Sequence, residues 1–429
     1  MEPLFCYNFT MEKFRVLSDL HMDINEKYPF SIEDKGIFTV IAGDTSGLPF
    51  IINVKFGNPS VGINIKSGIK VSEYFGNRKR IVLKYDAESG NWKHNGNPVP
   101  HDESGILITE NGVIDENREH SSKFHDGDTI TLTIKNPERW IRENVKRGII
   151  VAGNHLVYNS EGMSIEGLKR RLGTLFPPDS EITFLDNSIN VMSKEVDGIL
   201  FIGSTLYTDY RLPTVENKGF GEKAIIEHNK RMASPKMSGG GLNDFHYGRT
   251  EESTYNKAWY LESDSDLSYI TPENYERFFQ RTFSEIKRIV ENNPNKEIVI
   301  VTHHCPSPKC IDSGYVDSPL NASYVSDLEN FIVSHKNIKC WVCGHVHHRG
   351  DFRVGDCLIV MNPLGYCKYG EFLSSKDGIS GEWTPNTYVN VKTWEVEKEP
   401  FDLEKWKNLR EKERRASERW YRKYGAMFF

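Results

Sequence analysis

The stretch that decides the fold is Lys339–His348, KCWVCGHVHH, in which an apolar run stops at a glycine and histidines follow. The chain has only 14 histidines in 429 residues, yet His345, His347 and His348 stand almost side by side. A short apolar run bounded by turn signals is typical of a strand that is buried on both faces. We therefore predict a buried strand that ends in a group of potential metal ligands.

Five further apolar runs end in the same way, in polar or ionisable residues. They are FRVLSDLH (14–21), FTVIAGD (38–44), GIIVAGNH (148–155), ILFIGSTL (199–206) and EIVIVTHH (297–304). Helical patterns lie between them, and the clearest covers residues 271–293, where we expect Thr271 to cap the helix and Pro272 to begin it. Strands that alternate with helices predict an α/β fold.

Two segments depart from this alternation and set the predicted domain boundaries. Between residues 48 and 133, apolar residues recur at every second position and turn signals such as HNGNP punctuate them, which predicts an inserted β-rich module. Residues 401–429 are rich in Lys, Arg, Trp and Tyr and predict a basic, aromatic C-terminal helix. Residues 11–47 and 134–400 then form a discontinuous core.

The composition limits the classes of function. A net charge of −6 gives the whole chain no attraction to nucleic acid or to an anionic membrane. No apolar run is long enough to span a bilayer and the N-terminus lacks a signal-peptide pattern, so we expect a cytoplasmic protein without a membrane partner.

The seven cysteines have no framework spacing, which fits reduced thiols. In CWVC, Cys340 and Cys343 are three positions apart on the predicted strand. Residues at that spacing face opposite sides of a sheet. We expect the two thiols to pack as small core residues and not to share a metal.

The polar residues at the strand ends predict a metal site. Asp19 and His21 are two positions apart, as are His345 and His347, so each pair is expected to point the same way from its strand. The other candidate ligands are Asp44, Asn154 and His303. Because ligands of α/β sheets gather beyond the carboxyl ends of the strands, we expect these side chains to meet in one pocket.

The donor types indicate which ions such a pocket would hold. Two carboxylates, an amide oxygen and several imidazoles, with no thiolate required, suit divalent Mn, Fe, Zn or Ni. The donors are too many for one tetrahedral ion but fit two ions that share a bridging carboxylate. Two ions placed in this way can hold both the attacking and the leaving oxygen of a phosphoryl displacement.

In their order along the chain, these motifs resemble the calcineurin-like metallophosphoesterase family. The motifs are DLH (19–21), GD (43–44), GNH (153–155), THH (302–304) and GHVH (344–347), and longer stretches such as GSTLYTDY (203–210) and NPLGY (362–366) resemble a bacterial branch of it. The resemblance leaves out the insert and the C-terminal segment. It implies a four-layer α/β/β/α sandwich.

The resemblance also implies a role for each site residue. Asp19, His21 and His347 would hold one ion, Asn154, His303 and His345 the other, and Asp44 would bridge them. His155 would be the catalytic residue that protonates or stabilises the leaving oxygen after in-line attack by a hydroxide between the ions.

The implied activity is a hydrolase that acts on phosphate esters. A phosphodiester of nucleotide or nucleic-acid type is the first expectation for the substrate. A phosphomonoesterase acting on a small phosphorylated substrate is an alternative, and so is a non-catalytic scaffold of the same fold.

Several departures from the family pattern leave questions open. The segment GDTSG (43–47) lacks the later acidic residue and the Arg of the Ser/Thr protein phosphatase motif, which argues against that activity and leaves open what orients His155. The insert, which follows Asp44 directly, either gates the substrate or mediates oligomerisation.

The C-terminal helix either docks its aromatic side chains, forms an oligomer contact or binds a phosphate-bearing ligand such as nucleic acid. Tyr207, Asp209 and His246 are candidate substrate contacts.

Overall fold

We describe a computed structural model of the chain, which divides into two compact units. The core unit comprises Met1–Ser46, Glu143–Tyr158 and Met163–Phe429, and the insert unit comprises Gly47–Arg142 and Asn159–Gly162. The structure describes residues 11–25, 28, 30–45, 50–56, 62–65, 80–100, 106–109, 126–135, 137–158, 163–235, 241–251, 268–373 and 381–424.

The core unit contains two six-stranded sheets, and the first is built around four parallel strands. Its order is β11-β10-β2-β1-β20-β21, in which β1, β2, β10 and β11 are parallel and β20 and β21 are added antiparallel. The strands are β1 (Lys13–Leu17), β2 (Phe38–Ala42), β10 (Gly148–Val151), β11 (Ile182–Phe184), β20 (Thr387–Asn390) and β21 (Glu395–Lys398).

The second sheet also has four parallel strands at its centre, with one antiparallel strand at each edge. Its order is β12-β13-β16-β17-β19-β18, and β13, β16, β17 and β19 are parallel. The strands are β12 (Ser193–Val196), β13 (Ile199–Ser204), β16 (Glu297–Thr302), β17 (Ile338–Cys343), β18 (Gly350–Val354) and β19 (Cys357–Met361).

The two sheets pack against each other through one apolar cluster. It joins side chains such as Val16, Val40 and Val151 of the first sheet to Val299 and Val342 of the second. Near-continuous apolar strands are expected where both faces of a sheet are covered. The predicted α/β class is confirmed.

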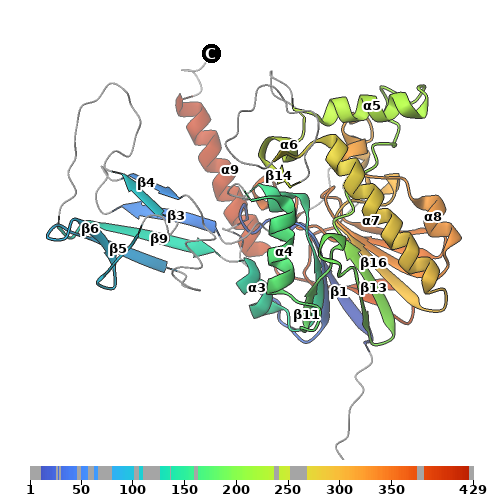
Figure 1. Ribbon diagram of the computed structural model, residues 1–429, viewed down its shortest axis with the longest axis horizontal. Helices are drawn as coiled ribbons and strands as arrows, with labels where there is room; N and C mark the ends of the chain where they lie inside the picture. The colour runs from blue at the N-terminus through green and yellow to red at the C-terminus, as the bar shows by residue number, and fades with distance from the viewer. Residues whose placement is uncertain are drawn as a thin grey trace, which may run out of the picture. The chain divides into compact units, whose positions relative to one another are not determined.

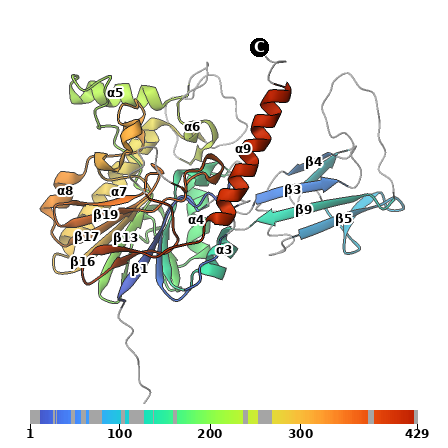
Figure 2. The same ribbon diagram turned by 180° about the vertical axis from the view of Figure 1, so that it is seen from behind.

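A second apolar cluster covers the other face of the second sheet, where helix α7 (Pro272–Asn292) lies along the strands (Figures 1 and 2). Thr271 caps this helix and forms a capping box with Asn274, while Pro272 takes the first turn, as predicted. Tyr275, Ile286 and Val290 are among its buried residues, so the helix holds its apolar stripe against the sheet.

The remaining helices are shorter, apart from the C-terminal one. They are α3 (Pro137–Asn144), α4 (Ile165–Leu175), α5 (Glu222–Ala233), α6 (Asp244–Tyr247), α8 (Glu329–Ser334) and α9 (Glu404–Tyr424). Single 3-10 turns are η1 (Asn154–Val157), η2 (Asn187–Ile189), η3 (Pro308–Cys310), η4 (Ser313–Tyr315), η5 (Asn321–Ser323) and η6 (Cys367–Tyr369), and a small pair is β14 (Arg249–Thr250) with β15 (Ser268–Tyr269).

Every strand pair described in the insert unit is antiparallel. One sheet has the order β3-β9-β5-β6-β7, and β4 pairs with β8. In β5 and β9, alternate residues are fully buried, which matches the period of two in the sequence. The strands are β3 (Phe50–Phe56), β4 (Gly62–Ile65), β5 (Arg80–Asp86), β6 (Asn91–His94), β7 (Asn97–Pro98), β8 (Ile106–Thr109) and β9 (Thr129–Lys135).

Helix α9 docks on the core unit through Trp406. This side chain is buried and stacks on Trp383 with ring centroids 5.9 Å apart, and its edge meets Tyr28 at 5.7 Å. The side chains of Trp420, Tyr421 and Tyr424 lie outside the described residues. Within the described residues, Trp406 therefore docks α9 through several aromatic contacts, while the oligomer and phosphate-binding roles of this helix stay predictions.

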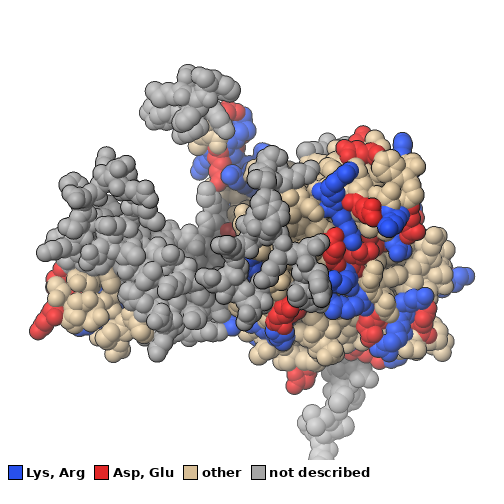
Figure 3. Space-filling model, turned by 45° about the horizontal axis from the view of Figure 1, so that its top comes forward, with Lys and Arg blue, Asp and Glu red and all other residues tan. Residues whose placement is uncertain are grey.

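Acidic residues offset part of the positive charge of α9. Arg414 and Arg415 both form ion pairs with Glu411, and Arg414 also pairs with Glu418. Over the described part of the face in Figure 3, Lys and Arg are interspersed with Asp and Glu. A nucleic-acid-binding surface would instead gather positive charge.

No helix within the described ranges combines the length and the apolar character needed to cross a membrane.

We predict that Trp406→Ala destabilises the core unit. Removing a buried indole leaves a cavity and costs about 3–5 kcal/mol of the free energy of unfolding. Urea unfolding followed by circular dichroism measures this loss. The matched control is Lys405→Ala, one position earlier and exposed, which should change the value by less than about 0.5 kcal/mol. Equal effects of the two substitutions would contradict the docking of α9.

Candidate metal centre

The predicted ligands follow strands of both sheets where parallel strands end. Asp19 and His21 follow β1, Asp44 follows β2, Asn154 and His155 begin η1 after β10, His303 follows β16, and His345 and His347 follow β17. Parallel strands deliver their carboxyl ends to the same edge of a sheet. Packing the two sheets face to face therefore brings the two sets of ends together.

The ligands lie in turns, which corrects the reason that the sequence suggested for their convergence. Asp19, His21, Asp44, His345 and His347 have φ values of 50°, 41°, 45°, 70° and 52°. The left-handed region is unusual for any residue with a side chain, although Asp and His adopt it more readily than most. The pairs two positions apart converge because the chain turns after the strand, and not because alternate residues share one face of a strand.

Glycines in these motifs leave room for the ligand side chains. A Cβ at Gly153 would lie 1.9 Å from Asp44 Oδ1, and a Cβ at Gly344 would lie 2.3 Å from Asp19 Oδ2. Each carboxylate therefore packs directly against glycine backbone. Gly153 and Gly344 therefore have a steric function.

The first group of ligand atoms belongs to Asp19, His21 and His347. These atoms lie within 4.8 Å of one another. The Nε2 atoms of His21 and His347 are 2.9 Å apart, and Asp19 Oδ1 lies 3.6 Å from His347 Nε2. The three side chains thus point at a common centre.

The second group belongs to Asp44, His303 and His345, again with ligand atoms within 4.8 Å. Asn154 joins it, because its Oδ1 lies 2.9 Å from His303 Nε2. His303 Nδ1 contacts the carbonyl oxygen of Ala42 at 3.0 Å, which leaves Nε2 as its inward-facing atom.

Asp44 lies between the two groups. Its Oδ2 is 3.2 Å from His303 Nε2 and 3.9 Å from His21 Nε2. The backbone N–H of His155 donates to Oδ1 at 3.0 Å, which fixes the carboxylate and leaves Oδ2 facing both sets of imidazoles. The structure therefore brings all seven predicted ligands together, with Asp44 between the two groups.

Burial and neighbouring charges set the protonation of these groups. Burial lowers the pKa of His21 and of His345 well below the usual range, so both rings are neutral at pH 7 and carry a free lone pair. Burial opposes the charged form of Asp44, but the facing His303 and His155 outweigh it and hold its pKa well below the usual range. A neutral imidazole and an ionised carboxylate are the forms that bind metal.

These residues fit two divalent ions. Asp19 Oδ2 and His345 Nε2 are buried and have no hydrogen-bond partner among the residues that the structure describes. Burial raises the pKa of Asp19, so a cation beside it would stabilise its ionised form. Imidazole, carboxylate and amide donors suit the ions named above and do not distinguish between them.

His155 is held beside the ligand groups by two tyrosines. Its Nε2 lies 3.0 Å from the hydroxyl of Tyr366 and 4.0 Å from Asp44 Oδ2. Its ring packs on Tyr158 with centroids 4.1 Å apart. Burial raises the pKa of Tyr366, so the phenol stays protonated. Tyr366 and Tyr158 therefore orient the His155 ring, which was left open by the sequence.

Two carboxylates that the sequence did not single out support the ligands. Glu371 Oε2 lies 2.7 Å from His347 Nδ1. Asp244 Oδ1 accepts hydrogen bonds from Asn154 Nδ2 at 3.0 Å and from the Tyr158 hydroxyl. Neither residue stands in a recognisable motif, although each lies close in sequence to stretches that drew attention.

The three candidate substrate contacts lie in different environments. Tyr207 is buried and packs on Tyr275 and His304, with ring centroids 4.5 Å and 5.5 Å away. Asp209 is also largely buried, and its Oδ1 accepts from the backbone N–H of Arg211 at 3.1 Å. His246 is exposed on α6, two positions from Asp244. We carry His246 alone forward as a proposed contact.

Comparisons with known proteins find likeness in solved structures alone. No family model matches the chain, and no curated protein matches it. A phosphopantetheinyl hydrolase from Mycobacterium tuberculosis is 12% identical at a TM-score of 0.45, with 83% of this chain and 91% of that chain covered. A dimetal phosphatase from Danio rerio is 12% identical at a TM-score of 0.28, with 53% and 75% covered. Because these TM-scores are below 0.5, the function proposed below rests on the residues of the site.

We predict that Glu371→Gln weakens metal binding. Burial opposes the charge of Glu371, but its hydrogen bond with His347 outweighs this and holds its pKa below the usual value. Removing a carboxylate that orients a ligating histidine lowers metal affinity by about 10–100-fold. Titration of the metal-free protein with Mn²⁺ or Zn²⁺ in a calorimeter measures the change. Glu395→Gln, on exposed β21, is the control, and equal affinities for the two variants would refute this role.

We predict that Asp244→Asn misplaces Asn154 and slows turnover. Asp244 accepts three hydrogen bonds, the third from Tyr275 at 2.9 Å, and an amide nitrogen in its place would face donors. We expect a loss of about 10–100-fold in metal affinity and a parallel loss of turnover. Tyr275→Phe, which removes one donor and keeps the carboxylate, should have a smaller effect on both. The reverse order would contradict this assignment.

Proposed function

We propose that this protein is a dinuclear metal-dependent phosphohydrolase. The observation that carries the proposal is the position of Asp44 Oδ2, which faces His303 and His21 from two different ligand groups. A carboxylate oxygen shared between two sets of ligands is what a pair of divalent ions requires. Asp19, His21 and His347 would hold one ion, and Asn154, His303 and His345 the other.

Two divalent ions, when bound, supply positive charge that neutralises phosphate oxygens and lowers the pKa of a water. The protein contributes the proton for the leaving group. His155 Nε2 faces Asp44 and Tyr366 at the centre of the site, so this atom would carry that proton. Tyr366 and Tyr158 keep the ring in place, and Asp44 holds the backbone of His155 through its Oδ1.

The substrate that we propose is a phosphodiester of nucleotide or nucleic-acid type. A proton held by His155 would assist the departure of an alkoxide from a diester or from a monoester, so a monoesterase shares this chemistry. We propose that His246, which is exposed on α6 two positions from Asp244, contacts the part of the substrate beyond the phosphate. A scaffold without activity would not need the complete set of seven ligands.

We predict that the metal-loaded protein hydrolyses bis-p-nitrophenyl phosphate faster than p-nitrophenyl phosphate. His155→Ala should lower turnover by about 10²–10⁴-fold while the bound metal, measured by mass spectrometry, stays unchanged. Asp44→Asn should lose both metal and turnover because the shared oxygen loses its charge. His228→Ala is the matched control, a histidine on α5 that belongs to none of the candidate ligand groups.

Each other outcome assigns a different function. Hydrolysis of the monoester alone would replace the diesterase with a monoesterase. Two bound ions without hydrolysis of either ester would contradict the proposed activity and favour the scaffold. Hydrolysis that survives both His155→Ala and chelation would exclude this site.

A further inference from the structure

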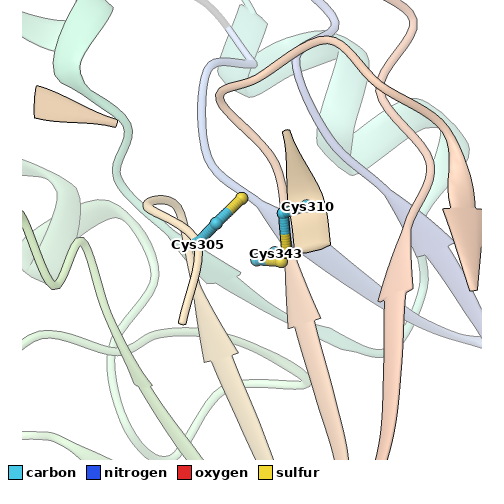
Figure 4. A group of neighbouring side chains, drawn as sticks. All are labelled: Cys305, Cys310 and Cys343. Carbon is cyan, nitrogen blue, oxygen red and sulfur yellow. The ribbon is translucent and has the colours of Figure 1, made fainter. Parts of the chain in front are cut away.

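Three cysteines from separate segments meet behind the proposed catalytic site. Cys305 follows β16, Cys310 ends η3, and Cys343 ends β17. Their sulfur atoms lie within 4.8 Å of one another, and all three residues are fully buried (Figure 4). They are free thiols in this structure.

This grouping is not the CxxC pair of the sequence. Cys340 belongs to the cluster between the two sheets, whereas Cys343 belongs to the cluster on the other face of the second sheet. The expected opposite orientation of the two thiols is confirmed. Cys343 lies beside Cys305 and Cys310 instead. The spacing of the cysteines in the sequence did not indicate this grouping.

We propose that Cys305, Cys310 and Cys343 bind one thiophilic metal ion, Zn²⁺ or Cu⁺, separate from the dinuclear centre. Thiolate sulfur is the donor that these ions prefer. Sulfur atoms around one tetrahedral zinc ion lie about 3.8 Å apart, given Zn–S bonds of about 2.3 Å, so small side-chain shifts would close the site. Three thiolates supply all the ligands of a trigonal ion or three of the four that a structural zinc ion takes.

The chain offers donors for a fourth position. His348 and Asp312 lie with Nδ1 and Oδ2 3.3 Å apart, and each follows one of the cysteines closely in sequence. A site without exposure has no open position for substrate, so the ion would be structural.

The position of the cluster gives the ion a specific structural role. Cys305 is two residues beyond His303, and Cys343 is two residues before His345. The two turns already touch, because Gly344 N–H donates to the carbonyl of His303 at 3.0 Å and Cys305 Sγ donates to the carbonyl of Gly344 at 3.1 Å. An ion on the three sulfurs would join these turns and fix the separation of two ligands of the dinuclear centre.

Two other roles for the cluster make different predictions. A disulfide between two of the cysteines would leave the third sulfur unpaired and would leave too few thiolates to hold a metal ion. Plain packing would leave the thiols without metal in any condition.

Titration of the reduced, metal-free full chain with Cd²⁺ tests the proposal. Thiolate–Cd²⁺ charge transfer absorbs in the ultraviolet, and the dinuclear centre has no thiolate, so the band reports Cd²⁺ bound to cysteine sulfur. We expect a saturable band that is displaced by Zn²⁺ or Cu⁺, with saturation reached within three equivalents because the two sites of the dinuclear centre also take up Cd²⁺. Asp44→Asn should keep the band, and this separates the outcome from that of the proposed phosphohydrolase.

Substitutions show which cysteines give rise to the band. Cys310→Ser and Cys343→Ser should each weaken the band, because one Cd–S bond is lost, and the matched control Cys340→Ser, a buried cysteine on the same strand, should keep it in full. The wild-type titration is decisive even if a serine variant fails to fold, since the lack of a band would overturn the proposal. An undiminished band in Cys310→Ser, or a disulfide among the three cysteines found by peptide mapping of the native protein, would overturn it as well.

Discussion

The Asp44 carboxylate is the group on which the rest of the site depends. Charge buried in a protein interior is costly unless it is paired and hydrogen-bonded, and here each oxygen has its own kind of partner. Oδ1 accepts from the backbone of His155, which follows β10, and Oδ2 faces His303, which follows β16 of the other sheet. The packing of the two sheets therefore brings together the partners that this buried carboxylate needs.

Residues outside the two sheets orient the ligand side chains that the strands bring together. Glu371 fixes one imidazole, Asp244 fixes Asn154 and Tyr158, and Tyr366 contacts His155. Tyr366 and Glu371 lie five residues apart in the segment after β19, whereas Asp244 is the first residue of α6. The strands set the distances between the ligands, and these residues set the orientation of each ring and amide.

The sequence was informative where a local pattern has a physical cause. Apolar runs that end in glycine and a polar residue predicted the strands, and the ligands were found because they directly follow those runs. Asp244 and Glu371 could not be found in this way, since their roles depend on how segments outside the two sheets fold back onto the site. The meeting of Cys310 with Cys343 likewise depends on tertiary structure. The reason given for the convergence of Asp19 with His21 was wrong, because a strand pattern does not show where the chain turns.

The left-handed backbone at five of the seven ligands has a consequence for how the site can change. Asp and His are among the few residues with side chains that tolerate this conformation, so each of these positions is constrained twice, once by the turn and once by the ion. Glu offers the same carboxylate as Asp but is less suited to the turn, and Gly suits the turn but offers no ligand. Few single substitutions satisfy both demands. If the sequence changed one residue at a time toward a different ligand set, the intermediate proteins would lose the turn, the ion or both.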